Sequence, residues 1–426
     1  MTGQAHNDSL LRFMTCGSVD DGKSTLIGRL LYDTKTILAD TLTQIEKTSK
    51  KRGMEAVDLS LLTDGLQAER EQGITIDVAY RYFSTGTRKY IIADAPGHEQ
   101  YTRNMVTAAS TANLAIILID ARKGVLTQTR RHSFLAHLVG IPHIVVAVNK
   151  MDLVDYDQAV FDKIRADYLA FATEIGLAQA RDIQFVPLSA LNGDMLVDRG
   201  DAMPWYSGPT MLEILEDAPP AHTEKNEAFR FPVQFVCRPH ASDDPELHDF
   251  RGFMGRIESG EIAVGDSVTV LPSGLSSKVK AIMIGDQNLQ RAITEQSVTL
   301  LLEDEIDTSR GDMIVKSGQV PEPVKQIDAM VCWLSETPLS AARTYIIRHT
   351  TRESKAKVGE ISYKIDVNTL EQLPAQGLAM NDIARISFRL AQPIMADAYS
   401  ENRATGAFIV IDESTNNTVG AGMITR

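Results

Sequence analysis

The sequence has few cysteines, no long apolar run and no basic or apolar stretch at its start. Cys16, Cys237 and Cys332 are too few and too scattered for a disulfide framework or a zinc site, so we interpret them as reduced thiols. The longest apolar runs, residues 114–119 and 144–148, are far shorter than the ~20 residues that span a bilayer. The first nine residues show no secretory signal. These absences predict a cytoplasmic protein with no membrane partner.

Basic residues are in the minority. The chain has 43 lysines and arginines against 56 aspartates and glutamates, which gives a formal net charge of −13. This balance disfavours a general binder of nucleic acid backbones, because such proteins neutralise phosphates with lysine and arginine. We therefore expect no nucleic acid partner. The basic residues 47–52 fit a solvated loop better than a docking site.

The chain divides by pattern into an α/β part and a β-rich part. Its 426 residues predict two or three domains. In the first half, buried strands that end in polar residues alternate with amphipathic helices, as in a doubly wound sheet. The strands are expected at residues 90–94, 114–120, 144–149 and 185–189, and a helix with one apolar face is expected at 161–175.

Short β-rich runs separated by Gly, Pro and Asp turns follow two prolines at 219 and 220, which suggests small barrels. A second boundary is expected at 318–323. We predict an α/β nucleotide-binding domain over residues 1–220 and β-barrel domains over 221–320 and 321–426. The runs expected as strands are 231–236, 267–271, 278–284 and 298–302, then 329–334, 344–347, 383–390 and 408–411.

Residues 17–24 match the phosphate-binding P-loop pattern G-x-x-x-x-G-K-[ST], between an apolar run and a helix-like segment. Its two glycines let successive N–H groups converge on a polyphosphate at a helix start, where the dipole also favours negative charge. Lys23 would reach the β- and γ-phosphates, and Ser24 would offer a hydroxyl to Mg²⁺. The expected nucleotide contacts are Gly17, Ser18, Val19, Asp20, Asp21, Gly22, Lys23, Ser24 and Thr25.

A second motif at the end of a predicted strand selects the base. It reads Asn149-Lys150-Met151-Asp152 and fits N-K-x-D, in which the Asp accepts from guanine N1–H and the exocyclic amine, a donor pair that adenine lacks. Lys150 would lie along the base, and Asn149 would tie this loop to the P-loop. The alternative is an Asn and an Asp that cap a helix at a strand–helix junction. The next strand end resembles the fifth GTPase motif, whose backbone N–H meets guanine O6: Ser189, Ala190 and Leu191.

A third motif, Asp94-Ala95-Pro96-Gly97-His98, fits D-x-x-G. In this pattern the Asp holds Mg²⁺ through a water and the Gly97 N–H senses the γ-phosphate, so that loss of the phosphate releases the loop. The alternative, a plain strand-to-turn exit, does not explain its place between the other two motifs. His98 would lie nearest the attacking water and position it, although a lone His is more often structural.

Thr75 would supply the second protein ligand of Mg²⁺ when GTP is bound. It follows Ser24 by 51 residues, a long insertion for a switch. Long loops in compact domains are usually functional, which favours this role.

These motifs, in this order, resemble the translation-factor class of GTPases. Residues 94–98, 73–76 and 204–210 are close to elongation factors Tu and 1-alpha, and residues 255–262 resemble their second domain. The resemblance implies an elongation-factor-like fold, an α/β P-loop GTPase domain followed by two small β-barrel domains. It also implies that Val19 and Ile74 flank the catalytic His98.

The P-loop Gly17-Ser18-Val19-Asp20-Asp21-Gly22-Lys23 departs from those elongation factors and is similar to the large GTPase subunits of bacterial sulfate adenylyltransferase. Residues 64–83 and 98–105 show the same similarity, which extends over essentially the whole chain. It implies that this chain hydrolyses GTP with Mg²⁺. A separate small subunit would join sulfate to the α-phosphate of ATP, giving adenosine 5′-phosphosulfate and pyrophosphate.

One further expectation follows from the motif count, and one alternative function follows from the elongation-factor resemblance. The chain has no second G-x-x-x-x-G-K, so we expect no adenylyl-sulfate kinase activity in it. The alternative function is an elongation-factor-like GTPase that delivers aminoacyl-tRNA.

Overall fold

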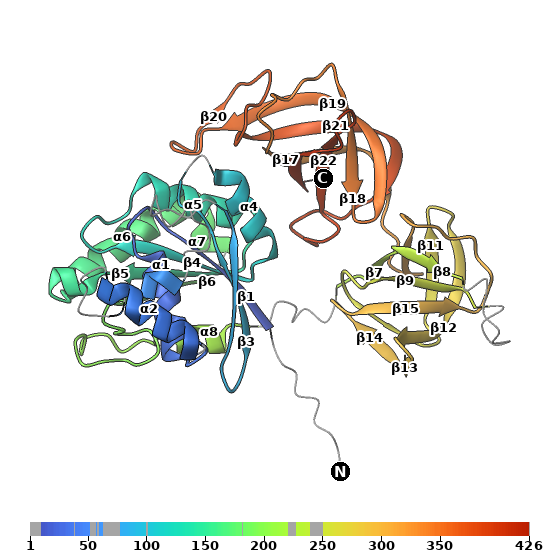
Figure 1. The fold of residues 1–426 in the computed structure, drawn as a ribbon. Helices are drawn as coiled ribbons and strands as arrows, with labels where there is room; N and C mark the ends of the chain where they lie inside the picture. Colours follow the sequence, from blue (N-terminus) through green and yellow to red (C-terminus); the bar gives the residue numbers. More distant parts are fainter. Residues whose placement is uncertain are drawn as a thin grey trace, which may run out of the picture. The chain divides into compact units, whose positions relative to one another are not determined.

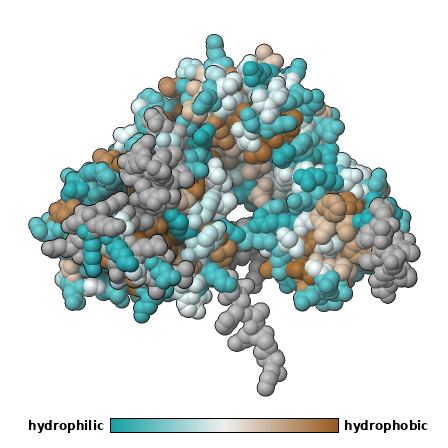
Figure 2. Space-filling view, in the orientation of Figure 1, coloured by the Kyte–Doolittle hydropathy of each residue, from teal (hydrophilic) through white to brown (hydrophobic). Residues whose placement is uncertain are grey.

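The computed structural model describes residues 10–37, 39–51, 57, 59–62, 77–98, 101–180, 182–219, 227–238 and 250–425. The chain forms two compact units, Met1–Ala221 and His222–Arg426. Figure 1 shows helices around a sheet in the first unit and strands in the second. On the face seen in Figure 2, hydrophobic side chains lie among hydrophilic ones. No helix in the described part of the chain has both the length and the hydropathy needed to cross a membrane.

The first unit is built on a six-stranded sheet in the order β2-β3-β1-β4-β5-β6, in which only β2 is antiparallel to its neighbour. Strand β4 is buried along its whole length, so both of its faces are covered. The order reverses at β1, which places a ligand crevice beyond the carboxyl end of that strand. The strands are β1 (Leu10–Cys16), β2 (Ala79–Ser84), β3 (Lys89–Asp94), β4 (Leu114–Asp120), β5 (His143–Asn149) and β6 (Asp182–Pro187).

Helices connect these strands. The apolar face predicted around 161–175 is confirmed in α6, where Phe161, Ile164, Tyr168 and Phe171 are buried. The interpretation of residues 47–52 as a loop was wrong for 47–51, which continue a helix. The helices are α1 (Lys23–Asp33), α2 (Ala39–Lys51), α4 (Thr102–Thr111), α5 (Thr127–Leu138), α6 (Gln158–Glu174), α7 (Leu177–Ala180) and α8 (Met211–Asp217), with 3-10 turns η1 (Leu59–Leu62) and η3 (Met151–Val154).

The second unit begins with a barrel in which strand neighbours follow the order β7-β16-β11-β12-β15-β9-β8. Its two end strands are almost consecutive in the chain, so their pairings with β16 and β9 close the sheet around one core. β13 pairs with β12 outside this order, and β10 and β14 form a separate two-stranded sheet. The strands are β7 (Arg230–Pro232), β8 (Phe235–Cys237), β9 (Gly252–Arg256), β10 (Glu261–Ala263), β11 (Ser267–Leu271), β12 (Leu275–Ile284), β13 (Gln287–Leu289), β14 (Arg291–Ile293), β15 (Ser297–Leu302) and β16 (Met313–Lys316).

A second barrel has the order β18-β22-β23-β17-β21-β19-β20, and an additional β18–β19 pairing closes it. Its separate core includes Trp333, Tyr345 and Phe388. The sequence pattern missed β19 because its buried positions carry the small residues Ser354 and Ala356 between exposed charged ones, so the apolar signal is weak. The strands are β17 (Pro323–Trp333), β18 (Thr344–His349), β19 (Arg352–Ile365), β20 (Gln372–Leu373), β21 (Ile383–Met395), β22 (Ala407–Asp412) and β23 (Thr418–Ile424).

Candidate functional site

The P-loop connects β1 to α1, as the apolar run and helical spacing predicted. Gly22 forms the N-cap of α1 with a φ of 95°, a left-handed conformation that glycine adopts without strain. A Cβ at this position would lie 2.4 Å from the side-chain nitrogen of Asn149, so space also requires glycine. Lys23 is buried at the first turn of the helix, and Ser24 beside it is half-buried. The loop is therefore folded in the conformation that exposes a helix N-terminus to an anion.

The carboxylate of Asp21 turns into the loop. It accepts the Ser18 N–H at 2.6 Å and is almost completely buried. Burial raises the pKa of Asp21, although the Ser18 N–H and the nearby Lys123 and Lys23 act in the opposite direction. The Asp21 side chain thus stabilises the conformation of the P-loop. A contact between Asp21 and the nucleotide stays a prediction.

The D-x-x-G motif begins at Asp94, the last residue of β3, and lies against the P-loop. Asp94 is buried and accepts a hydrogen bond from the Thr15 hydroxyl at 3.1 Å. A Cβ on Gly97 would lie 2.5 Å from the Gly17 carbonyl oxygen and 3.5 Å from Lys23 Nζ. The backbone of Gly97 therefore lies too close to the P-loop for a side chain to fit without a shift of the backbone. Ala95 and Pro96 between them are buried.

His98 is half-buried at the end of this loop. Its Nδ1 has no hydrogen-bond partner among the described residues, and its ring makes an edge contact with Tyr101, with centroids 6.3 Å apart. Within the described part of the chain, no hydrogen bond to Nδ1 therefore holds the imidazole ring of His98 in one orientation. Thr75 and Ile74 lie outside the described residues, so their predicted roles stay predictions.

A second histidine, which the sequence analysis missed, supports the same loop. His132 on α5 is buried and hydrogen-bonds to the backbone of Gly97. Burial, together with the charges of Lys23 and Arg131, lowers its pKa to about 3, so the imidazole is neutral near pH 7. No motif marks this residue, because it approaches Gly97 from another element of the fold.

The N-K-x-D motif begins at Asn149, the last residue of β5. Asn149 donates from Nδ2 to the Asp21 carbonyl at 2.7 Å, which confirms the predicted tie to the P-loop. Its Oδ1 accepts the N–H groups of Lys150 at 2.8 Å and Ala190 at 3.0 Å. Met151 is buried, whereas Asp152 in η3 is half-buried. The alternative of simple helix capping does not explain an amide that joins three loops.

The loop at 189–191 starts beyond β6, which ends at Pro187 rather than at 189 as predicted. Ser189 and Ala190 are buried, and Leu191 is exposed. The Arg29 guanidinium of α1 donates to the carbonyl oxygens of Ala190 and Leu191. Helix α1, the 189–191 loop and the loop of Asn149 are therefore hydrogen-bonded together.

The expected Mg²⁺ ligands can be compared with this geometry. Ser24 lies on the first turn of α1, and the buried Asp94 is the last residue of β3, the strand beside β1. Within the described residues, no group of three or more His, Cys, Asp or Glu side chains forms a metal site. One hydroxyl and one carboxylate at the P-loop fit an ion that shares its ligands with bound phosphates, which is how Mg²⁺ is usually held.

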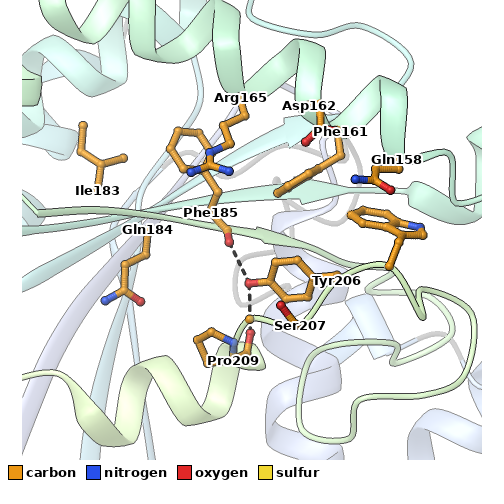
Figure 3. A pocket seen from close by; sticks show the side chains of 12 residues that line it. Gln158, Phe161, Asp162, Arg165, Ile183, Gln184, Phe185, Tyr206, Ser207 and Pro209 are labelled. Atoms are coloured by element: carbon orange, nitrogen blue, oxygen red, sulfur yellow. Dashed lines mark hydrogen bonds between the residues drawn. The ribbon is translucent and has the colours of Figure 1, made fainter.

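A cavity of about 570 Å³ lies elsewhere in the first unit, between α6, β6 and residues 205–209 (Figure 3). The Tyr206 hydroxyl donates to the carbonyls of Phe185 at 2.9 Å and Pro209 at 3.3 Å. Trp205 packs against Phe161, with ring centroids 5.5 Å apart. None of the predicted nucleotide-site residues lines this cavity. The aromatic residues Trp205 and Tyr206 of the 204–210 motif instead attach their loop to α6 and β6 through these contacts.

Comparisons with known proteins agree with this geometry. Residues 8–221 match the family "Elongation factor Tu GTP binding domain", and residues 326–425 match "GTP-eEF1A C-terminal domain-like". The chain is similar to "Sulfate adenylyltransferase subunit 1" of Aliarcobacter butzleri, with 56% identity over 98% of this chain and 88% of that protein. The protein of the same name from Cellvibrio japonicus is 55% identical over 99% of this chain and 88% of that protein.

Two further similarities differ in extent. "Bifunctional enzyme CysN/CysC" of Rhodopirellula baltica is 54% identical over 99% of this chain but only 64% of that protein. Among solved structures, "crystal structure analysis of sup35 complexed with GMPPNP" has 22% identity and a TM-score of 0.44, over 99% of this chain and 94% of that chain. The latter similarity is too low to bear on the site.

Proposed function

The chain belongs to the family of sulfate adenylyltransferase subunit 1, and on this basis we propose that it is the GTPase subunit of a sulfate adenylyltransferase in sulfate assimilation. It hydrolyses GTP in the cytoplasm. A separate small subunit forms adenosine 5′-phosphosulfate and pyrophosphate from ATP and sulfate. Joining sulfate to the α-phosphate is steeply uphill, so coupling to GTP hydrolysis supplies the driving force.

The observation that supports the GTPase role is the convergence of Gly97 on the P-loop. Its backbone lies beside the Gly17 carbonyl and Lys23 Nζ, where a γ-phosphate would be held. The Gly97 N–H then detects that phosphate, and its loss on hydrolysis frees the loop. Lys23 stabilises charge on the β- and γ-phosphates, and His98 orients the attacking water.

The base site gives the nucleotide preference. Asp152 accepts from guanine, and Asn149 holds the loop that carries it at a fixed position beside the P-loop. Lys150 and the 189–191 loop complete the base pocket. Mg²⁺, when bound with GTP, supplies positive charge at the phosphates. Ser24, Thr75 and, through a water, Asp94 would hold this ion.

The alternative, delivery of aminoacyl-tRNA, has less support. The elongation-factor-type families match residues 8–221 and 326–425 as separate domains, whereas the subunit 1 relatives are 55–56% identical over 98–99% of the chain. The net charge of −13 also disfavours a nucleic acid partner.

The deciding experiment follows radiolabelled sulfate into adenylyl sulfate. The chain alone should hydrolyse GTP slowly and form no product, because its motifs provide one nucleotide site. Addition of the small subunit should stimulate hydrolysis and let GTP raise product beyond the uncoupled equilibrium. Lys23→Ala in this chain should abolish that rise but leave the partner's uncoupled activity. Product from this chain alone, or an unchanged yield with the variant, would refute the proposal.

A further inference from the structure

A buried carboxylate outside the sequence motifs adjoins the base site. Asp120 is the last residue of β4 and pairs in register with Asn149, the last residue of β5. Because the two strands are parallel, their carboxyl ends meet at one edge of the sheet. The Asp120 side chain has 0% exposure. A buried charge of this kind requires partners, and its partners lie in the base-reading loop and in the segment after β4.

Two cations hold this carboxylate. Lys150 Nζ lies 3.1 Å from Asp120 Oδ2, and the Arg122 guanidinium donates to Oδ1 at 3.0 Å and to Oδ2 at 2.7 Å. The Arg122 N–H adds a fourth contact, to Oδ1 at 3.0 Å. Burial would raise the pKa of Asp120, but these bonds outweigh it and hold the pKa well below its usual range. The carboxylate is therefore ionised at every pH at which the protein would work.

The contacts fix the position of Lys150. Its ammonium binds the Asp120 carboxylate on one side and donates to the Asp20 carbonyl of the P-loop on the other. Lys150 itself has a φ of 64°, so both its backbone and its side chain are held in an unusual arrangement. Ordering a lysine side chain costs conformational entropy. Because Lys150 is already ordered by these contacts in the folded protein, this cost does not arise again when a nucleotide binds.

We propose that Asp120 is a positioning residue for guanine nucleotide binding, which holds the Lys150 ammonium so that its alkyl chain is in place before the base arrives. This inference rests on the proposed nucleotide site. Preorganisation lowers the entropic cost of binding, and its loss appears mainly in the dissociation rate. GTP and GDP share the same base, so Asp120 acts equally on both.

The test uses the full chain and stopped-flow release of fluorescent GDP and GTP analogues. Asp120→Asn keeps the shape and removes the charge, and it should speed the release of both nucleotides by ~10-fold. The fall in kcat/KM for GTP hydrolysis should come mainly from KM. Asp182→Asn is the matched control, because that carboxylate starts β6 and its side chain is 59% exposed. It should release nucleotide at the wild-type rate.

A double-mutant cycle distinguishes positioning from general stability. In a Lys150→Met background, Asp120→Asn should change the release rate by less than ~2-fold, because its effect passes through the lysine. The inference would be overturned if Asp120→Asn released nucleotide at the wild-type rate. It would also be overturned if Asp120→Asn changed the release rate equally in the wild-type and Lys150→Met backgrounds. If Asp120→Asn does not fold, Arg122→Gln decides, since that side chain is 46% exposed. It should speed release by ~3-fold only when Lys150 is present.

Failure of the proposed function gives a different result. A wild-type chain that binds no guanine nucleotide would overturn both proposals. If the wild-type chain binds GTP and Asp120→Asn releases it at the same rate as wild type, only the role of Asp120 is overturned.

Discussion

The side-chain nitrogen of Asn149 lies 2.7 Å from the backbone oxygen of Asp21, although 128 positions separate the two residues in the sequence. The same side chain accepts from Lys150 and Ala190. One amide therefore sets the distance between the loop expected to bind phosphate and the loops expected to bind the base.

Replacing this amide should weaken nucleotide binding as a whole. Asn149→Ala removes three hydrogen bonds worth ~1 kcal/mol each, so we expect GTP and GDP affinity to fall together by on the order of 100-fold. Isothermal titration with both nucleotides measures the change. Asn192→Ala, whose amide donates to the Tyr156 hydroxyl in the same region, is the control and should bind normally. A loss confined to GTP would contradict the bridging role.

Asp152→Asn should shift preference from guanosine to xanthosine nucleotides. The amide presents a donor where guanine needs an acceptor, whereas xanthine offers a carbonyl at that place. Competition between GDP and XDP for a fluorescent analogue measures the shift. Equal binding of GTP and ATP by the wild-type protein would show that the base-site assignment is wrong.

Gly97→Ala should separate GTP from GDP. The added Cβ would meet the Gly17 carbonyl oxygen at 2.5 Å, and this backbone atom has little freedom to move. Displacement of the Gly97 N–H should cost a non-hydrolysable GTP analogue ~10-fold in affinity, with GDP little affected. Gly86→Ala is the control, because no atom lies within 4 Å of its Cβ position. Equal affinity losses for both nucleotides would count against a γ-phosphate sensor.

His98→Ala should keep GTP binding and slow hydrolysis by ~10²-fold with the small subunit present, as loss of a water-positioning group does. Single-turnover hydrolysis measures the effect. His143→Gln, at the amino-terminal end of β5, is the control. Hydrolysis by His98→Ala at the wild-type rate would remove the assigned role.

The first unit should lose stability in acid through His132. Its pKa in the folded state is about 3, against an ordinary value of 6.5, so below pH 6.5 the unfolded chain binds a proton that the folded chain does not. Stability is therefore complete above pH 6.5 and falls as the pH drops toward 3. At pH 5 the cost is about 2 kcal/mol.

His132→Gln should remove this part of the pH dependence. Trp205 and Trp333 are the two tryptophans, so a Trp333→Phe background confines the fluorescence signal to the first unit. Urea titrations at pH 7 and pH 5 then compare the unfolding free energies. An equal loss between the two pH values with and without His132 would show that other groups cause it.

The sequence by itself determined the parts of the site that are contiguous. Residues 17–24 carry strand, turn and helix signals in order, and the local rules for glycine and for helix starts are enough to predict a P-loop. The Asn149 tie could also be predicted, because its motif includes both the amide and the strand end that positions it. The polar residues at strand ends also allowed four strands of the first unit to be predicted, and their observed carboxyl ends lie within about two residues of the predicted ones.

Only the tertiary structure decided which isolated residues support those motifs. His132 reaches Gly97 from α5, and Asp120 reaches Lys150 across the β4–β5 pairing, so each depends on neighbours with no fixed sequence separation. The strands that the sequence pattern missed include β2 and β19, whose exposed polar and aromatic faces weaken the apolar signal. Closure of each barrel likewise depends on pairings between strands that are distant in the sequence. These pairings could not be predicted, because backbone hydrogen bonds between strands do not depend on residue identity.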